Sequence, residues 1–172
     1  MTFCDLAFGR VVLPGVTVSV SRPAWACMAA QYAGWAVDIP VGDGGKKYFA
    51  MVSGPARALY RGEALFNDLD YADQAGVAVL ALETRKLPPA EVVAWVAAKC
   101  GVEPSGVQLV VAPTASLAGS VQIAARVVET GLHKMQEPGY GMAAVQAGNG
   151  QCPPAPAGAA DPPALGRTHS AA

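Results

Sequence analysis

The sequence predicts a domain of the α/β class, more closely an α+β sandwich in which helices pack on a mixed sheet. Stretches with strand character alternate with stretches of helical character along most of the 172 residues. Hydrophobic residues make up 52% of the chain and charged residues 15%, which is typical of a globular protein with a substantial core.

The first half of the chain predicts two strands with a helix between them. Residues 11–21 carry valines at alternating positions, which indicates a strand. The uncharged stretch that follows predicts a buried helix over residues 25–35. Glycines and an aspartate at 42–45 predict a turn, because these residues supply its backbone conformations. Residues 48–52 then predict a short strand.

The second half predicts two more strands and two helices. Short apolar runs at 77–82 and 107–111 predict neighbouring buried strands. A proline pair opens a helix near 90–99, which we expect to end before Gly101. A stripe of apolar residues at helical spacing predicts the second helix over 119–135.

The composition changes near residue 148, where proline, glycine and alanine become dense and few side chains could anchor a core. The sequence therefore predicts a core over residues 1–147 and a C-terminal tail over 148–172, extended or poorly ordered.

Charge and hydropathy exclude two classes of partner. The net charge of −1 and the pI near 6.1 provide no basic field for a phosphate backbone, so we expect no nucleic-acid partner. The longest uncharged stretch, residues 23–37, contains Gln31 and is shorter than a membrane span, which needs about 20 apolar residues. We therefore expect no membrane partner. The first residues lack the basic start and apolar centre of a secretory signal, with Asp5 and Arg10 interrupting them.

The cysteines give no sign of a metal site or a disulfide framework. They are scattered, with no close pair: Cys4, Cys27, Cys100 and Cys152. We therefore expect no metal and a reducing cytoplasmic compartment. A nucleophilic pair of Cys27 with His133 stays open, although the apolar surroundings of Cys27 favour a structural thiol.

Arg126 and Glu129 form the most informative pair in the chain. They lie three residues apart in the predicted helix 119–135, so their side chains share a face. A guanidinium in that position can hold a carboxylate in its ionised form, which general-base chemistry requires. The alternative is a surface ion pair of little energetic value.

Several blocks of the sequence, in their order and spacing, resemble the methenyltetrahydromethanopterin cyclohydrolase family, most closely its bacterial form in methylotrophs. The blocks are QYAGW at 31–35, YFAMVSGPARA at 48–58, VAVLALETRKLP at 77–88, KCGV at 99–102 and VVAPTASLAGSVQIAARVVET at 110–130.

The resemblance implies a hydrolase of one-carbon metabolism that interconverts 5,10-methenyl- and N5-formyl-tetrahydromethanopterin without a bound cofactor. It also implies a homotrimer. The family's essential arginine and glutamate have the same R-x-x-E spacing, so Arg126 and Glu129 become the expected catalytic residues.

The resemblance also suggests walls for a pterin pocket, for which helix capping and loop chemistry are the alternative roles. The expected substrate-binding residues are Ser53, Gly54, Thr114, Ser116, Ser120 and Gln122. Glu83 and Arg85 lie at the end of a predicted strand. Their two alternative roles are an ion pair with each other and membership of this site.

The chain departs from the family at its ends, because family members are longer on both sides. Near the C-terminus, His169 follows Gly-Arg-Thr where the family usually has asparagine. The resemblance therefore implies a partial version of the family's two-part subunit. The alternative function is a non-catalytic fragment that keeps the fold and a self-association surface.

Overall fold

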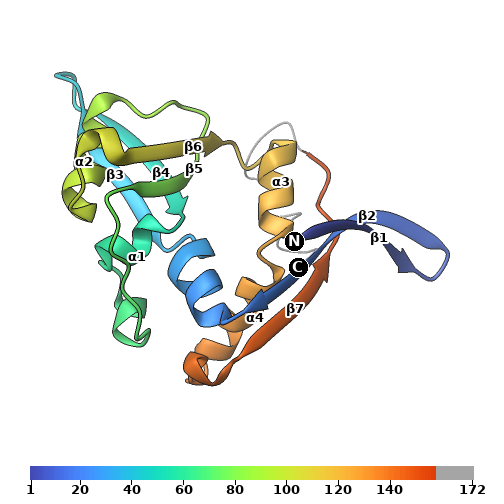
Figure 1. Ribbon diagram of the computed structural model, residues 1–172. Coiled ribbons are helices and arrows are strands. Elements are labelled where there is room, and N and C mark those ends of the chain that lie inside the picture. Colours follow the sequence, from blue (N-terminus) through green and yellow to red (C-terminus); the bar gives the residue numbers. More distant parts are fainter. Residues whose placement is uncertain (158–172) are drawn as a thin grey trace. The chain divides into compact units, whose positions relative to one another are not determined.

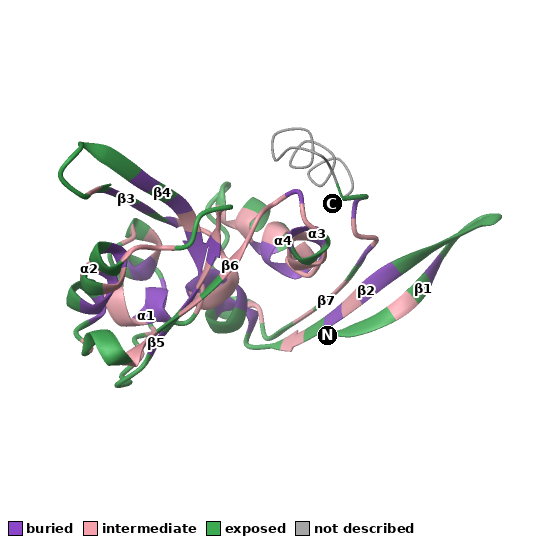
Figure 2. Cartoon of the chain, turned by 90° about the horizontal axis from the view of Figure 1, so that it is seen from above, coloured by how far each residue is buried: buried purple, intermediate pink, exposed green. Residues whose placement is uncertain are grey.

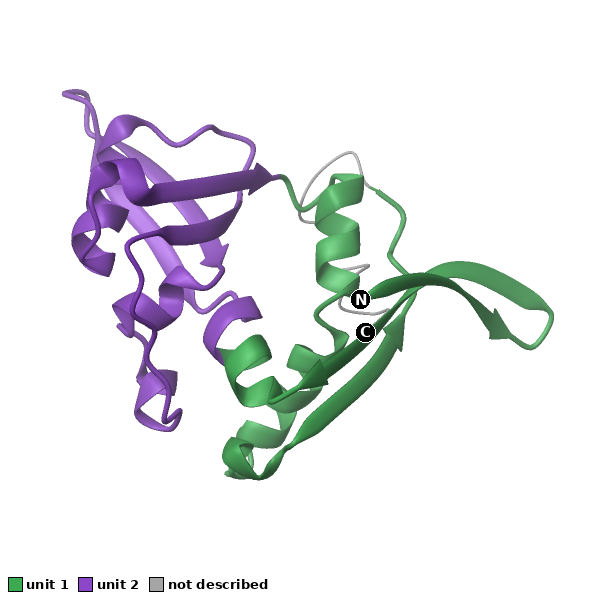
Figure 3. Ribbon diagram, in the orientation of Figure 1, with its two compact units in different colours: residues 1–28, 113–172 green, residues 29–112 purple. Residues whose placement is uncertain are grey.

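The computed structural model describes residues 1–157, which divide into two compact units. Residues 29–112 form one unit, and residues 1–28 together with residues 113–157 form the other (Figure 3). Figure 1 labels the helices and strands of both.

The unit of residues 29–112 contains a mixed sheet of four strands in the order β3-β4-β5-β6. These are β3 Trp35–Val41, β4 Lys46–Ser53, β5 Ala78–Glu83 and β6 Val107–Ala112. Strand β4 pairs antiparallel with both β3 and β5. Strands β5 and β6 pair parallel, with Leu80 opposite Leu109. The predicted pairing of the runs at 77–82 and 107–111 is therefore confirmed.

The helices of this unit include α2, Ala90–Cys100, which confirms the helix predicted near 90–99. Pro89 precedes its first turn, and Gly101 ends it with a φ of 66°, a left-handed conformation that glycine adopts without strain. The shorter helices are α1 Ala56–Tyr60, η2 Ala64–Asn67 and η3 Pro104–Gly106.

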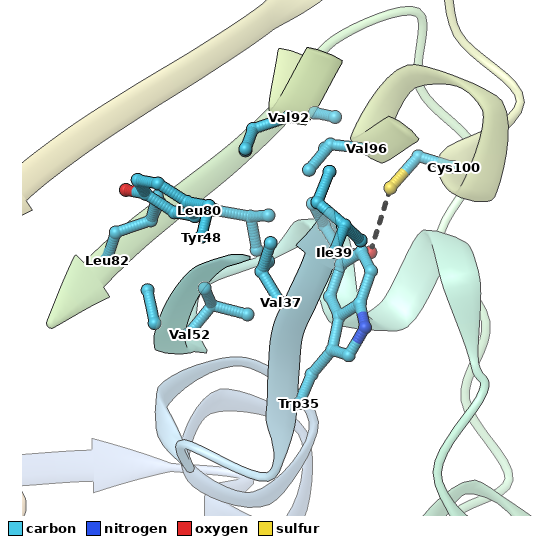
Figure 4. Close-up of a cluster of buried hydrophobic side chains, with 13 residues drawn as sticks. Trp35, Val37, Ile39, Tyr48, Val52, Leu80, Leu82, Val92, Val96 and Cys100 are labelled. Carbon is cyan, nitrogen blue, oxygen red and sulfur yellow. Dashed lines mark hydrogen bonds between the residues drawn. The ribbon is translucent and has the colours of Figure 1, made fainter. Parts of the chain in front are cut away.

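Buried side chains from β3, β4, β5 and α2 form the core of this unit (Figure 4). Leu80, Val92 and Val96 have no exposed surface. The strand β6 was expected to be buried but is less so, because it lies at the edge of the sheet and Val110 is 62% exposed.

The other unit contains an antiparallel sheet in the order β1-β2-β7. Its strands are β1 Thr2–Phe8, β2 Val11–Ser21 and β7 Ala147–Cys152. The strand predicted at 11–21 is confirmed, whereas β1 was not predicted. The far end of the β1–β2 hairpin is largely exposed (Figure 2).

Strand β7 begins where the C-terminal tail was predicted. Its glycines resemble a linker in the sequence, yet residues 147–152 hydrogen-bond to β2 in regular register. Residues 153–157 follow without regular structure, and the rest of the predicted tail lies outside the described residues.

Two predicted helices differ from those observed. The helix expected over 25–35 is a π-helix, η1 Ala24–Gln31, that ends before Gly34 because Trp35 begins strand β3. The helix expected over 119–135 is two helices, α3 Leu117–Ala124 and α4 Val127–Gln136, followed by the short η4 Met142–Ala144. Within residues 1–157, no helix is long and apolar enough to cross a membrane.

Truncating the core of the four-stranded sheet should destabilise the protein. Leu80→Ala removes a side chain with no exposed surface, so we expect a loss of about 2–5 kcal/mol in the free energy of unfolding. Val110→Ala, on the neighbouring strand but 62% exposed, should change it by about 0.5 kcal/mol or less. Urea denaturation of both variants measures the difference, and equal losses would contradict the described core.

Candidate active site

The interruption between α3 and α4 sets the local geometry of the candidate site. Ala125 and Arg126 lie between the two helices, and the N–H of Arg126 donates to the carbonyl of Ile123 at 3.0 Å. Arg126 is the N-cap of α4, so Glu129 is the third residue of that helix. A negative charge is stabilised at the N-terminus of a helix, because the first backbone N–H groups have no partner within the helix and carry partial positive charge.

Arg126 and Glu129 form an ion pair that is largely buried. Nε of Arg126 donates to Oε2 of Glu129 at 2.6 Å. The Glu129 side chain is 3% exposed and that of Arg126 is 18% exposed. The alternative of a surface pair is therefore wrong, and the removal of either partner would leave a buried charge without its main counterion.

Cys27 interacts electrostatically with Glu129. The thiol is buried in η1, and burial, with a smaller contribution from the Glu129 carboxylate, raises the pKa of Cys27 to about 11. The residue is therefore a neutral thiol near pH 7. His133 is partly exposed, with Nδ1 3.8 Å from Oε1 of Glu137. The raised pKa argues against the nucleophilic pair of Cys27 with His133.

Ser116 has the capping role that was left open for it. Its hydroxyl accepts from the N–H of Gly119 at 3.0 Å and donates to the carbonyl of Pro113 at 2.6 Å. A Cβ on Gly119 would lie 2.4 Å from the Pro113 carbonyl oxygen, so the loop before α3 closes directly on the helix. The start of α3 is thereby fixed.

The other predicted binding residues of this unit lie on or beside α3. Ser120 is buried and donates to the carbonyl of Ala155, which ties the segment after β7 to the helix. Thr114 and Gln122 are half-buried, Thr114 in the loop before α3 and Gln122 within it. These residues and the Arg126–Glu129 pair thus come from one continuous stretch of chain.

Ser53 and Gly54 belong to the other unit. Ser53 is buried at the end of β4. The N–H of Gly54 donates to the carbonyl of Ala30 at 2.6 Å, and its φ is 128°. A Cβ at this position would lie 2.6 Å from the Val79 carbonyl oxygen, so a close backbone approach and an unusual φ both require glycine.

A second buried ion pair was not predicted from the sequence. Arg57 has no exposed surface and donates from Nε and Nη2 to the two carboxylate oxygens of Glu63, at 2.8 and 2.6 Å. The rings of Tyr32 and Phe66 flank its guanidinium at 5.2 and 5.6 Å. Neither helical nor strand periodicity links these residues, so no pattern in the sequence indicated the pair.

Glu83 ends β5 and is half-buried, and the chain turns away from the sheet at Arg85. In the described part of the chain, no group of three or more histidine, cysteine, aspartate or glutamate side chains could hold a metal ion.

Comparison with known proteins gives the family. The family model described as "Cyclohydrolase (MCH)" matches residues 2–172, and the chain belongs to this family.

The relatives that support this carry the name methenyltetrahydromethanopterin cyclohydrolase. The protein of Methanococcoides burtonii is 46% identical over 160 residues, covering 92% of this chain and 48% of its own length. That of Methanosarcina barkeri is 44% identical over 157 residues, covering 91% and 47%. That of Methanocaldococcus jannaschii is 52% identical over 128 residues, covering 74% and 38%. The chain spans about half the length of the curated relatives it matches.

The Cys27 thiol should make stability depend on pH in the alkaline range. Its pKa is raised in the folded state from the ordinary 9.0 to about 11, so the fold favours the protonated thiol. The corresponding stability is fully present below pH 9 and is lost as the pH rises through 11. The unfolding free energy of Cys27→Ala, measured in urea from pH 8 upward, should fall less steeply than that of the unaltered protein. Identical slopes would contradict the buried neutral thiol.

Proposed function

We propose that the protein is a cyclohydrolase that interconverts 5,10-methenyl-tetrahydromethanopterin and N5-formyl-tetrahydromethanopterin. Family membership supports the substrate class, and the buried Glu129 carboxylate paired with Arg126 at 2.6 Å is the observation that carries the chemistry. The proposed substrate is a pterin one-carbon carrier, and no bound cofactor enters the proposed reaction.

The methenyl substrate suits a base rather than a nucleophilic side chain. Its methenyl carbon lies between two nitrogens and shares their positive charge, so it is already electrophilic. Water forms a bond to this carbon while Glu129 accepts one of its protons. The bond from the carbon to N10 then breaks, the second proton of the water is lost as the formyl carbonyl forms, and N10 regains a proton. One proton is released overall.

Three features of the surroundings of Glu129 serve this chemistry: its burial, its pairing with Arg126 and its place at the start of α4. An ionised carboxylate attracts the cationic substrate, and that attraction is stronger where water is excluded. Arg126 fixes the direction of the carboxylate through its Nε–H and stabilises its charge. The position of Glu129 in the first turn of α4 supports the same ionised state.

We assign binding of the pterin to the substrate-binding residues that the resemblance suggests. The hydroxyls of Ser116 and Ser120 hold the loop before α3 and the segment after β7, so we give them the role of shaping the surface. Thr114 and Gln122 are the candidates for direct hydrogen bonds to pterin heteroatoms. Ser53 and Gly54, at the end of β4, keep the binding role that the family resemblance implies for them.

The proposal extends to assembly and location. The family resemblance implies a homotrimer, and the cysteines favour the cytoplasm. Four free thiols, at Cys4, Cys27, Cys100 and Cys152, are in keeping with a reducing compartment.

Replacing Glu129 with glutamine should abolish most of the turnover. The change keeps the size of the side chain but removes its charge and basicity, so we expect a loss of about 10²–10⁴-fold in kcat. The decrease in absorbance of the methenyl substrate measures it. Glu137→Gln is the matched control, because Glu137 lies just after the same helix but is exposed, and it should retain activity.

Two outcomes would contradict the proposal. An undiminished rate in Glu129→Gln, above the spontaneous hydrolysis, would exclude Glu129 as the base. No turnover by the unaltered chain would favour the alternative of a non-catalytic role that retains the fold and a self-association surface.

Replacing Arg126 with lysine should impair turnover and change its pH dependence. Lysine keeps the positive charge but lacks the planar guanidinium that holds Oε2 of Glu129 at 2.6 Å. We expect kcat to fall and its pH profile to shift relative to the unaltered protein. A profile that overlays the original would show that Arg126 does not act on the base.

A further inference from the structure

The face of β7 that packs against α4 is built from glycine. Successive residues of a strand point to opposite faces, so Gly148 and Gly150 share one face, which we call the glycine face. Their partners on β2 are Val20 and Val18. At these two positions the sheet face therefore carries branched side chains on β2 and none on β7, whereas Cys152, next along the same face of β7, lies opposite Val16.

The first turn of α4 fills the space that the glycines leave. A Cβ on Gly148 would lie 2.5 Å from Cγ1 of Val128, and a Cβ on Gly150 would lie 2.7 Å from Cγ1 of Val127. Both distances are far below ordinary carbon contact. Neither glycine has a positive φ, so space and not backbone conformation is what requires glycine here.

The two valines cannot easily turn away from an added methyl group. Valine carries two branches on Cβ, which restrict its side-chain rotamers and keep both methyl groups close to the backbone. A larger residue on the glycine face would therefore displace the helix itself. Interiors pack densely enough that such a shift is transmitted to neighbouring residues.

The residues that would move are those of the candidate site. Val127 and Val128 are the two residues between Arg126 and Glu129 in the chain. The 2.6 Å contact of Nε with Oε2 thus spans the turn that rests on the glycine face. We propose that Gly148 and Gly150 are positioning residues, which set the position of the Arg126–Glu129 pair through Val128 and Val127. The inference deepens the proposed function and rests on it.

The test exchanges bulk between strand and helix. Gly148→Ala should lower kcat at least tenfold with a smaller change in KM, because the base is displaced while the rest of the site is kept. Gly148→Ala combined with Val128→Ala removes the colliding Cγ1 and should restore most of kcat. Gly150→Ala with Val127→Ala repeats the exchange one step along the strand.

Two control variants separate positioning from a general effect of substitution. Asn149→Ala changes the same strand on its opposite, exposed face. Gly131→Ala changes α4 at a position where an added Cβ meets nothing within 4 Å. Both should keep kcat near that of the unaltered protein.

A second readout does not depend on turnover. The Nε–H resonance of Arg126, assigned by its loss in Arg126→Lys, reports the hydrogen bond to Glu129. It should shift in Gly148→Ala and return in the double variant. Failure of the proposed function appears as no turnover by the unaltered protein, and this resonance still tests the glycine face.

The inference is overturned if Gly148→Ala leaves both kcat and the resonance unchanged, or if Val128→Ala fails to restore them. Should Gly148→Ala not fold, the double variant must fold and show the original resonance. A double variant that also fails to fold, or that folds with a shifted resonance, would overturn the inference equally.

Discussion

A buried carboxylate must have a partner, and this constraint organises the unit that contains the candidate site. The Glu129 side chain is 3% exposed, so water stabilises its charge little, and the charge depends on Arg126 and on the first turn of α4. Each of these depends in turn on packing elsewhere. The break at Ala125 and Arg126 places the arginine at the helix start, and the glycine face of β7 admits the valines between the two residues.

The unit of residues 29–112 also contains a buried charge with a partner. Arg57 is fully buried, and Glu63 with the rings of Tyr32 and Phe66 surrounds its guanidinium. A Cβ on Gly34 would lie 2.0 Å from Oε2 of Glu63, so glycine leaves room for the carboxylate. Two of the sequence blocks that resemble the family, at 31–35 and 48–58, therefore contain residues whose packing holds this charge.

The elements with clear periodicity or end signals could be predicted from the sequence. Helix α2 has prolines before it and Gly101 after it, and β5 and β6 are short apolar runs. The Arg126–Glu129 pair was found because helical spacing is a local property. The break before α4 contains no proline or glycine, and β7 is rich in glycine, so neither had a local signal. The burial of Glu129 results from tertiary packing, which periodicity does not encode.

The central claim is that Arg126 and Glu129 act as one buried unit, and a double-mutant cycle of stability tests it most directly. The free energies of unfolding of Arg126→Ala, Glu129→Ala and the double variant would be measured in urea at neutral pH. If the two residues form a buried pair, the sum of the two single losses in unfolding free energy should exceed the loss in the double variant by more than about 1 kcal/mol. Losses that add within about 0.5 kcal/mol would contradict the account, because independent residues behave in that way.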